Sequence, residues 1–462
     1  MAARSEVQVH YGIRSIALPD EAIRRESLNR PTNTVVVTAY AARTGFGDTD
    51  ATIKARLDGK SSAVVFQGPT GGTEPRVAAP LSIDSAHLYD PFAELNLNSK
   101  DQRWFSYQAG VELVVVRDAL NRAGLLGPDG RLDHSVDPER GGLFVYSGSG
   151  QQLNYYSIGK KVDEGRRVKP TDPFQAFTDQ PNIRVAEQLG LTGGKARFAS
   201  AACASSPYAF EDAYLQITSG ELDFVVAGGI ETVFENPDHS EKIFAFFDAL
   251  HSLSRNPDPE TANRPLDRNR EGFVLGEGAA VLVLESLEHA QQRGAKILAV
   301  LEQATTSIDA DDQTMANQDN VSRLMRRTLT DRRAGRLILP AVYMGHLTST
   351  KVGDPIEIGA LRGAIPEEYI GETAIVAPKS ATSHTVGASG AMAAVELVNT
   401  LETGSIAPTI HLQEPDEELI HGLDIVTERR DSSPTNAPQN GAVVSMGFGG
   451  QNGGIRLRKW EE

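Results

Sequence analysis

The chain has 462 residues, 40% of them hydrophobic and 23% charged, and carries a formal net charge of −16 at pH 7. This length can bury two cores or one large duplicated core, and the acidic charge argues against a general role in binding nucleic acid. No apolar run is long enough to span a membrane, and the amino-terminal residues lack the apolar core of a signal peptide, so we expect a cytoplasmic protein with no membrane segment.

The first 295 residues alternate buried apolar runs with stretches of helical periodicity. Residues 1–32 are polar and mixed in charge, so we interpret them as an appendage outside the core, with a surface helix predicted over residues 20–28. Residues 67–90 are rich in glycine and proline and are predicted to be loop. Strands are predicted over residues 34–38, 143–146, 224–227 and 280–284, and helices after the turn at 45–47, over 99–125 and over 286–293.

The same plan begins again after residue 295, although no repeat is visible residue by residue. Strands are predicted over residues 297–301, 341–343, 375–377 and 442–445, and helices over 321–328 and 387–401. Strands that alternate with helices favour layered α/β packing around largely parallel sheets. We therefore divide the chain into the appendage (1–32), an N-terminal half (33–295) and a C-terminal half (296–462).

Cys203 is the only cysteine, which excludes a disulfide framework and a cysteine-rich metal site. Residues 195–202 predict a buried strand, and a helix is predicted from Ser205 to Gly220, with Ser205 or Ser206 as its cap. A thiol at such a turn lies near free backbone N–H groups and a helix dipole, which predicts a lowered pKa. A lone cysteine among alanines is also a common small buried residue, and this stretch by itself favours that interpretation.

Three further stretches place polar side chains beside predicted strand ends. Residues 344–354 contain His346, residues 377–390 contain His384, and residues 446–452 form a glycine-rich turn around Phe448. Taken singly, each has an ordinary explanation, because a histidine beside a strand is often structural and the glycine turn lacks the spacing of a phosphate loop.

In this order the four stretches resemble the motifs of the elongating β-ketoacyl-acyl-carrier-protein synthases, the ketosynthases of fatty acid and polyketide assembly. Those motifs are an alanine- or serine-rich nucleophile turn, a His-Gly-Thr-x-Thr loop, a Lys-Ser-x-x-Gly-His loop and a Gly-Phe-Gly-Gly turn. Residues 264–278 match a fifth motif, and the resemblance covers about residues 33–460. It implies a thiolase-like α/β fold whose two similar halves, each with a five-stranded sheet, form a layered α-β-α-β-α core.

The resemblance also implies a chemical role for the central residues. Cys203 would take an acyl chain as a thioester from the phosphopantetheine of an acyl carrier protein, with the N–H groups of Cys203 and Phe448 as the oxyanion hole. Neutral His346 and His384 would donate hydrogen bonds to the thioester oxygen of malonyl-acyl carrier protein. The carbanion left after decarboxylation would then attack the Cys203 thioester and yield a β-ketoacyl product.

Further positions match the family's supporting residues. Lys379 corresponds to the lysine that organises the histidine loop, and Thr348 and Thr350 to the threonines that bind phosphopantetheine. Phe448 corresponds to the gate of the acyl pocket and Phe247 to its opposing aromatic ring, and we expect the pocket to end near the aromatic cluster of Phe244, Phe246 and Phe247. The resemblance implies no metal or redox cofactor, an acyl carrier protein as partner, and a homodimer or a heterodimer with a chain-length factor.

Several positions depart from the motifs. Leu347 stands where the motif has glycine, and its bulk raises the question of loop geometry and malonyl access; Met344-Gly345 replaces the usual Asn-Ala before His346. Ser383 replaces the glycine before His384. Ala393 occupies the position of a glutamate that often partners the lysine, so Glu396 or Glu357 is the candidate replacement.

The residues also bear on rival activities. A degradative thiolase uses a second cysteine as base, which this chain lacks, and an initiating synthase pairs histidine with asparagine, whereas both loops here carry histidine. A non-catalytic chain-length factor typically lacks the nucleophile that Cys203 supplies. We therefore expect a decarboxylating Claisen condensation in fatty acid or polyketide biosynthesis, with a non-catalytic or specialised subunit of a heterodimer as the alternative.

Overall fold

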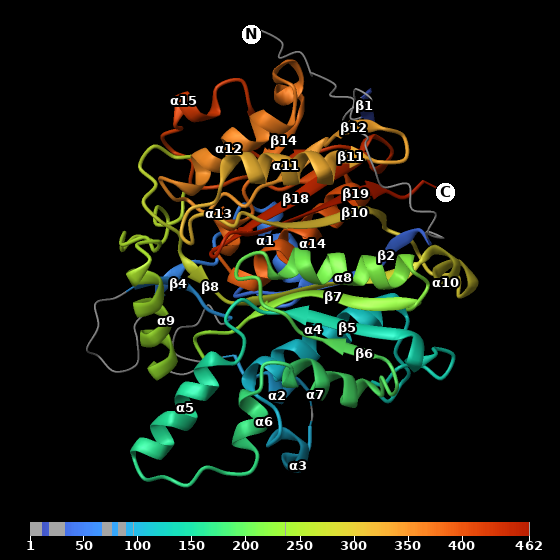
Figure 1. The fold of residues 1–462 in the computed structure, drawn as a ribbon, viewed down its shortest axis with the longest axis vertical. Coiled ribbons are helices and arrows are strands. Elements are labelled where there is room, and N and C mark those ends of the chain that lie inside the picture. Colours follow the sequence, from blue (N-terminus) through green and yellow to red (C-terminus); the bar gives the residue numbers. More distant parts are fainter. Residues whose placement is uncertain are drawn as a thin grey trace.

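The computed structural model describes residues 12–17, 33–66, 76–81, 89–95, 97–235 and 237–461. In this part of the chain one sheet of eleven strands runs in the order β16-β14-β13-β18-β19-β10-β2-β9-β7-β5-β6 (Figure 1). The antiparallel pair β2–β10 joins its two halves. The strands are β2 (Val35–Arg43), β5 (Gly141–Tyr146), β6 (Lys195–Arg197), β7 (Phe224–Glu231), β9 (Gly278–Ser286), β10 (Ala299–Ile308), β13 (Val342–Met344), β14 (Ala374–Val376), β16 (Asp424–Ile425), β18 (Asn440–Gly447) and β19 (Gln451–Lys459).

The strand order repeats between the two halves of this sheet. When the five strands of each set are numbered in chain order, both sets lie side by side in the order third, second, fourth, fifth, first. The first set is β2, β5, β6, β7 and β9, and the second is β10, β13, β14, β18 and β19. The second, third and fourth strands pair parallel in each set, and the fourth, fifth and first pair antiparallel. The duplication is therefore in the topology, and β16 extends the second set. The boundary at residue 295 stays a prediction.

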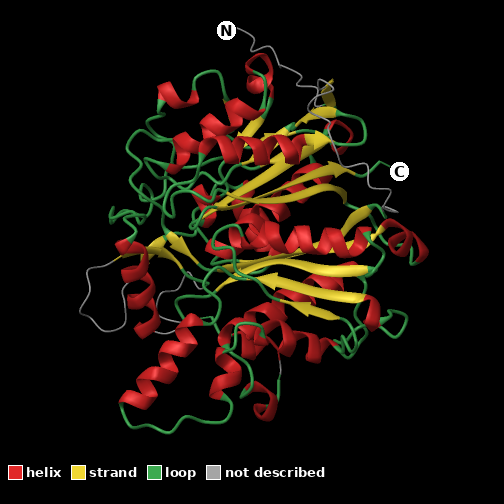
Figure 2. Ribbon diagram, viewed as in Figure 1, coloured by secondary structure: helices red, strands yellow, loops and turns green. Residues whose placement is uncertain are grey.

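Helices cover both outer faces of the two half-sheets and also fill the space between them (Figure 2). Side chains of two helices that lie between the half-sheets share one apolar core with both sets of strands. Separate cores lie beneath each outer layer. This is the α-β-α-β-α order that the resemblance implied. The central helices are α8 (Ser205–Thr218) and α14 (Ser389–Thr403), and the main outer ones are α4 (Tyr107–Ala123) and α7 (Gln180–Leu189) on one side and α11 (Gln318–Leu329) and α12 (Gly353–Ala364) on the other.

Composition explains why α14 takes the central position. Every residue from Ser389 to Leu401 is buried and most of them are small or apolar, and a helix that is hydrophobic all round is typical of a buried position. In contrast, α11 is amphipathic: Val321, Leu324 and Met325 face the core while the remaining side chains are largely polar.

Smaller elements surround these layers. Strand β1 pairs antiparallel with β12, so part of the predicted appendage adds a strand to the C-terminal half, whereas the helix predicted over residues 20–28 lies outside the described residues. The other strands are β1 (Arg14–Ala17), β3 (Val64–Phe66), β4 (Arg76–Ala79), β8 (Leu275–Gly276), β11 (Thr330–Asp331), β12 (Arg336–Leu339), β15 (Ser405–Ile406) and β17 (Arg430–Asp431). The other helices are α1 (Thr49–Leu57), α2 (Pro91–Leu95), α3 (Ser99–Gln102), α5 (Gln152–Asp163), α6 (Asp172–Ala176), α9 (Pro237–Ala249), α10 (Leu287–Gln292), α13 (Lys379–Thr382) and α15 (Glu417–Ile420).

The single helix predicted over residues 99–125 is wrong, because two helices occupy it. Helix α3 ends at Gln102, and α4 begins after Ser106, whose side chain accepts a hydrogen bond from the backbone N–H of Ala109. A serine that caps a helix has extended backbone angles, so it starts a new helix instead of continuing the old one. The apolar periodicity of the segment does not reveal this interruption.

Three other predicted elements need correction. Strand β6 spans only residues 195–197 and is partly exposed at the sheet edge, so the buried strand predicted over 195–202 is wrong. Residues 76–79, predicted as loop, form β4, which pairs with β3 and β8. Helix α8 has Ala204 at its N-cap, and the Ser205 hydroxyl instead accepts from Ala201 N and donates to Ala202 O.

Glu112 on α4 leads to a stability prediction. Its side chain is buried, neither carboxyl oxygen has a hydrogen-bond partner in the described structure, and burial raises its pKa well above the usual value. When a carboxyl has a higher pKa in the folded than in the unfolded state, the folded protein loses stability as the pH rises above the unfolded-state pKa. We expect Glu112→Leu to raise the free energy of unfolding by about 1–3 kcal/mol at pH 8 and by less near pH 4.5.

Denaturant unfolding at the two pH values measures this difference. Glu187→Leu on the neighbouring helix α7 is the matched control, because Glu187 is exposed and should give no such gain. A loss of stability at pH 8 in Glu112→Leu would contradict the interpretation.

Candidate active site

Cys203 lies in a tight turn between β6 and α8. Ala202 holds a left-handed backbone angle, φ +48°, and the N–H groups of Ala204 and Ser205 close the turn on Ala201 and Ala202. The thiol is buried at the start of the central helix layer. Backbone N–H groups of Cys203 and Phe448 donate toward the sulfur, which places both predicted oxyanion-hole donors beside it.

The two predicted histidines converge on this thiol. His384 Nε2 lies 3.0 Å from Cys203 Sγ, and the rings of His346 and His384 lie 5.4 Å apart at an interplanar angle of 88°. Lys379 Nζ lies 3.2 Å from His346 Nδ1 and donates to the His346 carbonyl at 2.6 Å. Four residues that are far apart in the sequence thus meet in one buried cluster.

The fifth motif, residues 264–278, holds both histidine loops in place. His384 N donates to Val274 O at 2.8 Å, and Gly276 N donates to His384 O at 3.0 Å. At the other loop, Gly272 N donates to Ser349 O at 2.9 Å. The segment therefore works as a backbone clamp across the two loops, a function that its sequence did not reveal.

Glu357 organises the backbone of the first histidine loop. Its two oxygens accept hydrogen bonds from the N–H groups of His346 and Leu347, each at 2.6 Å, and from the Tyr343 hydroxyl at 2.7 Å. Its charge also favours the charged form of Lys379. The second candidate partner of the lysine, Glu396, instead forms a buried bidentate ion pair with Arg56, both contacts at 2.8 Å, and this alternative is wrong.

The structure explains how the loop accepts Leu347. The leucine side chain is fully buried in the outer core of the C-terminal half, whereas Cys203 belongs to a different apolar cluster, so the leucine bulk is taken up by the outer core. An alanine Cβ at position 345 would lie 2.7 Å from Leu347 Cδ1. Gly345 thus makes room for Leu347, and the two departures from the motif form one coupled change.

Both glycine positions that this chain replaces require a left-handed backbone. Leu347 has φ +23° and Ser383 has φ +59°. Glycine adopts such angles freely, whereas other residues hold them at a cost of about 1–3 kcal/mol when the surroundings enforce them. The hydrogen bonds from His346 and Leu347 to Glu357 supply that enforcement in the first loop.

Burial dominates the protonation of the cluster. It lowers the pKa values of His346 and His384 well below their usual value, aided by the positive charge of Lys379, so both rings are neutral at pH 7. Burial lowers the pKa of Lys379 to about 8, against the raising effect of Glu357. Burial raises the pKa of Cys203 to about 12, because desolvation outweighs Lys379 and the two N–H donors. The lowered thiol pKa expected from the helix dipole is therefore wrong.

Aromatic rings form one side of the site. Phe448 and Phe247 face each other with ring centroids 6.5 Å apart, and Phe273 stands edge-on to His384 at 4.7 Å. Phe244 and Phe247 are buried in the apolar cluster that contains Cys203. Phe246 is 57% exposed, and its ring lies 5.2 Å from that of Phe247, so the expectation that the pocket ends near these rings stays a prediction.

Thr348 and Thr350 follow His346 at the rim of the cluster. Their hydroxyl oxygens lie 3.3 Å apart, and Thr350 Oγ1 accepts a hydrogen bond from Gly353 N at the start of α12. Thr348 is nearly buried and Thr350 is partly exposed, so the pair extends from the cluster toward the surface.

Glu231, at the end of β7, is a supporting residue that the sequence analysis missed. Its buried carboxylate accepts hydrogen bonds from the N–H groups of Gly148 and Gly387 at 3.0 Å and Ser149 at 3.1 Å. It thereby ties the loop after β5 to the segment that follows His384. A charged residue ending an apolar strand is the sequence signal that would have pointed to it.

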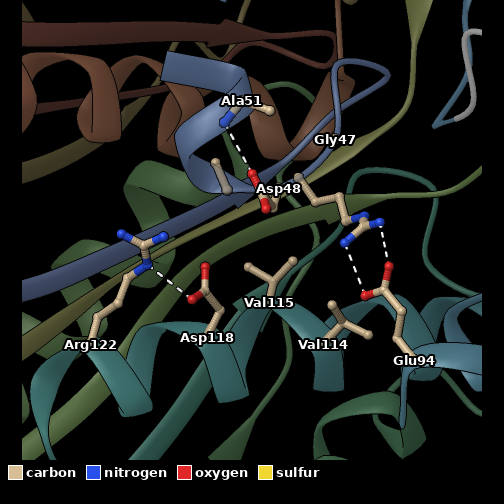
Figure 3. Close-up of a pocket in the computed structure, with 10 residues that line it drawn as sticks. Gly47, Asp48, Ala51, Glu94, Val114, Val115, Asp118 and Arg122 are labelled. Carbon is tan, nitrogen blue, oxygen red and sulfur yellow. Dashed lines mark hydrogen bonds and ion pairs between the residues drawn. The ribbon is translucent and has the colours of Figure 1, made fainter. Parts of the chain in front are cut away.

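An open cavity of about 620 Å³ lies elsewhere, between α1 and α4 (Figure 3). Arg43 pairs there with Glu94 at 2.6 Å and Arg122 with Asp118 at 2.9 Å, while Asp48 accepts a hydrogen bond from Ala51 N at 3.0 Å. None of the predicted site residues lines it. In the described ranges no cluster of three His, Cys, Asp or Glu side chains is suited to a metal ion, and no helix has the length and apolarity to cross a membrane.

Family models match most of the sequence. The N-terminal domain of the beta-ketoacyl synthases matches residues 32–290, and the C-terminal domain of the same family matches residues 298–413. This chain belongs to the β-ketoacyl synthase family. The family and the thiolase-like fold inferred from the five motifs are thereby confirmed.

The alignments with individual relatives cover most of this chain and most of each relative. The chloroplastic 3-oxoacyl-acyl-carrier-protein synthase I of Arabidopsis thaliana is 33% identical, with 91% of this chain and 86% of that protein aligned. The 3-oxoacyl-acyl-carrier-protein synthase 2 of Staphylococcus aureus strain N315 is 33% identical over 82% of this chain and 88% of that protein. A beta-ketoacyl synthase from Burkholderia phymatum STM815 is 28% identical, with a TM-score of 0.79 over 93% of this chain and 100% of that one.

The coupling of Gly345 and Leu347 in this synthase is testable by a double-mutant cycle. Gly345→Ala alone should destabilise the protein by about 1–3 kcal/mol, because the new Cβ meets the leucine. Leu347→Gly should lose buried area, but Gly345→Ala added to it should cost little further. Denaturant unfolding of the four proteins should show a coupling of about 0.5–3 kcal/mol, and strictly additive effects would contradict it.

The raised thiol pKa predicts slow alkylation of the free synthase. Because Cys203 is the only cysteine, intact-mass measurement after iodoacetamide reports on it alone. The rate should rise about tenfold per pH unit between pH 7 and 9.5, since the reactive thiolate fraction grows in that proportion below the pKa. Free cysteine is the control and should level off above its pKa of about 8.5. A plateau for Cys203 below pH 8 would show that the helix dipole prevails.

Proposed function

We propose that this chain condenses an acyl group bound to Cys203 with malonyl-acyl carrier protein and forms a β-ketoacyl-acyl carrier protein. The observation that carries the proposal is the 3.0 Å contact between Cys203 Sγ and His384 Nε2, with the ring of His346 beside it. A nucleophile and two neutral hydrogen-bond donors in a dry cluster are what this reaction needs.

In the first half-reaction the Cys203 sulfur attacks the acyl thioester of the carrier protein. The bond between sulfur and the acyl carbon forms, the bond to the phosphopantetheine sulfur breaks, and the thiol proton ends on that departing sulfur. The N–H groups of Cys203 and Phe448 hold the oxyanion in between. Because the resting thiol is protonated, arrival of the substrate must make its deprotonation easier, and the charge of Lys379 favours the thiolate.

In the second half-reaction His346 and His384 act as donors to the thioester oxygen of the malonyl group. Loss of carbon dioxide leaves the electron pair on the α-carbon, with negative charge shared by that oxygen, which the two N–H groups stabilise. The carbanion then attacks the carbonyl carbon of the Cys203 thioester, and the bond from that carbon to the sulfur breaks. The sulfur leaves as the thiolate and takes up a proton from solvent, which restores the resting thiol. Neutral rings suit this role, since the pKa values of both histidines lie well below their usual value.

The partner and substrate carrier follow from this chemistry. Thr348 and Thr350 bind the phosphopantetheine of the acyl carrier protein, Lys379 positions His346, and Phe448 and Phe247 gate the acyl pocket. The reaction draws on these side chains alone, without a metal or redox cofactor. We place the enzyme in the cytoplasm, as a homodimer or as the active subunit of a heterodimer with a chain-length factor.

Acyl transfer to Cys203 tests the proposal directly. Incubation with acyl-acyl carrier protein should add one acyl group per chain, removable by hydroxylamine, and Cys203→Ala should abolish both loading and condensation. Cys203→Gln should retain malonyl decarboxylation, because the amide takes the place of the acyl thioester beside the histidines. A wild-type protein that accepts no acyl group and releases no carbon dioxide from malonyl-acyl carrier protein would instead identify a non-catalytic subunit.

A further inference from the structure

The two histidines of the cluster have different partners at Nδ1. Lys379 Nζ lies 3.2 Å from Nδ1 of His346, whereas the Ser389 hydroxyl oxygen lies 2.9 Å from Nδ1 of His384. Ser389 is the first residue of α14, and its oxygen also lies 3.3 Å from Oγ1 of Thr385. All of these side chains are buried, so bulk water does not compete for these contacts.

A neutral imidazole carries its proton on one nitrogen only, and the partner of the other nitrogen decides which. A lysine side chain offers donors, so Lys379 makes Nδ1 of His346 an acceptor and leaves the proton on Nε2. A hydroxyl both donates and accepts. At His384 the tautomer therefore depends on which way the Ser389 hydroxyl points.

Acylation of Cys203 determines which way the Ser389 hydroxyl points. Once Cys203 carries an acyl chain its sulfur has no proton to donate, and the malonyl thioester oxygen is an acceptor too. Nε2 of His384 can make a hydrogen bond on that side only if it carries the proton, which requires a donor at Nδ1. The Ser389 hydroxyl is in place to be that donor, and the Thr385 hydroxyl can donate in turn to the Ser389 oxygen.

We infer that Ser389 is a positioning residue, whose hydroxyl donates to Nδ1 of His384 and keeps the proton on Nε2 for decarboxylation. The inference rests on the function proposed above and adds to it a device that controls one of the two donors. It gives the buried stretch at the start of α14 a chemical role in addition to its close packing.

Separate assays of the two half-reactions test this role. Ser389→Ala should lower the rate of malonyl decarboxylation about 10- to 100-fold, the range known for removal of the hydrogen-bond partner that orients a metal-binding histidine. Acyl loading of Cys203 should change little, because the N–H groups of Cys203 and Phe448 support that step. Ser389→Thr retains a hydroxyl and should recover most of the decarboxylation.

Ser445→Ala is the matched control. This buried serine of β18 lies beside Gly390 of α14, and its hydroxyl has no hydrogen-bond partner among the described residues. It should leave both half-reactions unchanged. Decarboxylation at the wild-type rate in Ser389→Ala overturns the inference. Equal losses in loading and decarboxylation, accompanied by a lower melting temperature, overturn it as well, since they indicate a structural role.

Nitrogen NMR of the wild-type protein gives a test that needs no folded Ser389 variant. With ¹⁵N-labelled histidine, and with His384→Gln used to assign the resonance, Nδ1 of His384 should show the shift of an unprotonated acceptor in the acylated protein. A proton on Nδ1 overturns the inference. Wild-type protein that decarboxylates no malonyl group at all would refute the proposed function, a different result from an active protein that is indifferent to Ser389.

Discussion

The two halves of the molecule meet at a contact between a thiol and an imidazole. Cys203 precedes α8 and His384 precedes α14, the two helices enclosed between the half-sheets, and their reactive atoms lie 3.0 Å apart. The shared core around α8 and α14 fixes this distance, because close-packed interiors resist small shifts of one element against another. The site therefore depends on the packing of the two halves, and neither half contains it alone.

Enclosure in that packing decides the chemistry of each group. Desolvation keeps the histidines neutral, which suits hydrogen-bond donors, and it also keeps the resting thiol protonated. The buried charge of Lys379 lies near Glu357, which also holds the backbone of the loop by accepting the N–H groups of His346 and Leu347. One carboxylate thus serves both the electrostatics and the geometry of the loop.

Strands with continuous apolar runs, such as β2 and β9, were predictable because burial on both faces leaves a strong signal in the sequence. The break between α3 and α4 was not, since Ser106 interrupts a helix without disturbing its apolar periodicity. The direction of the Cys203 pKa shift was also not predictable from the sequence. A helix dipole is visible in a sequence pattern, whereas the desolvation that outweighs it depends on which residues cover the sulfur.

The sequence by itself determined the family, and it predicted Cys203 as the nucleophile with His346 and His384 as its partners, because the proposed reaction restricts the residue types and their order along the chain. Only the tertiary structure decided the consequences of Leu347 and the partner of His384. The leucine enters the outer core since Gly345 leaves space for it, and Ser389 reaches the histidine because the turn before α14 folds back on it. Such contacts depend on distances of a few ångströms between side chains, which residue order does not encode locally.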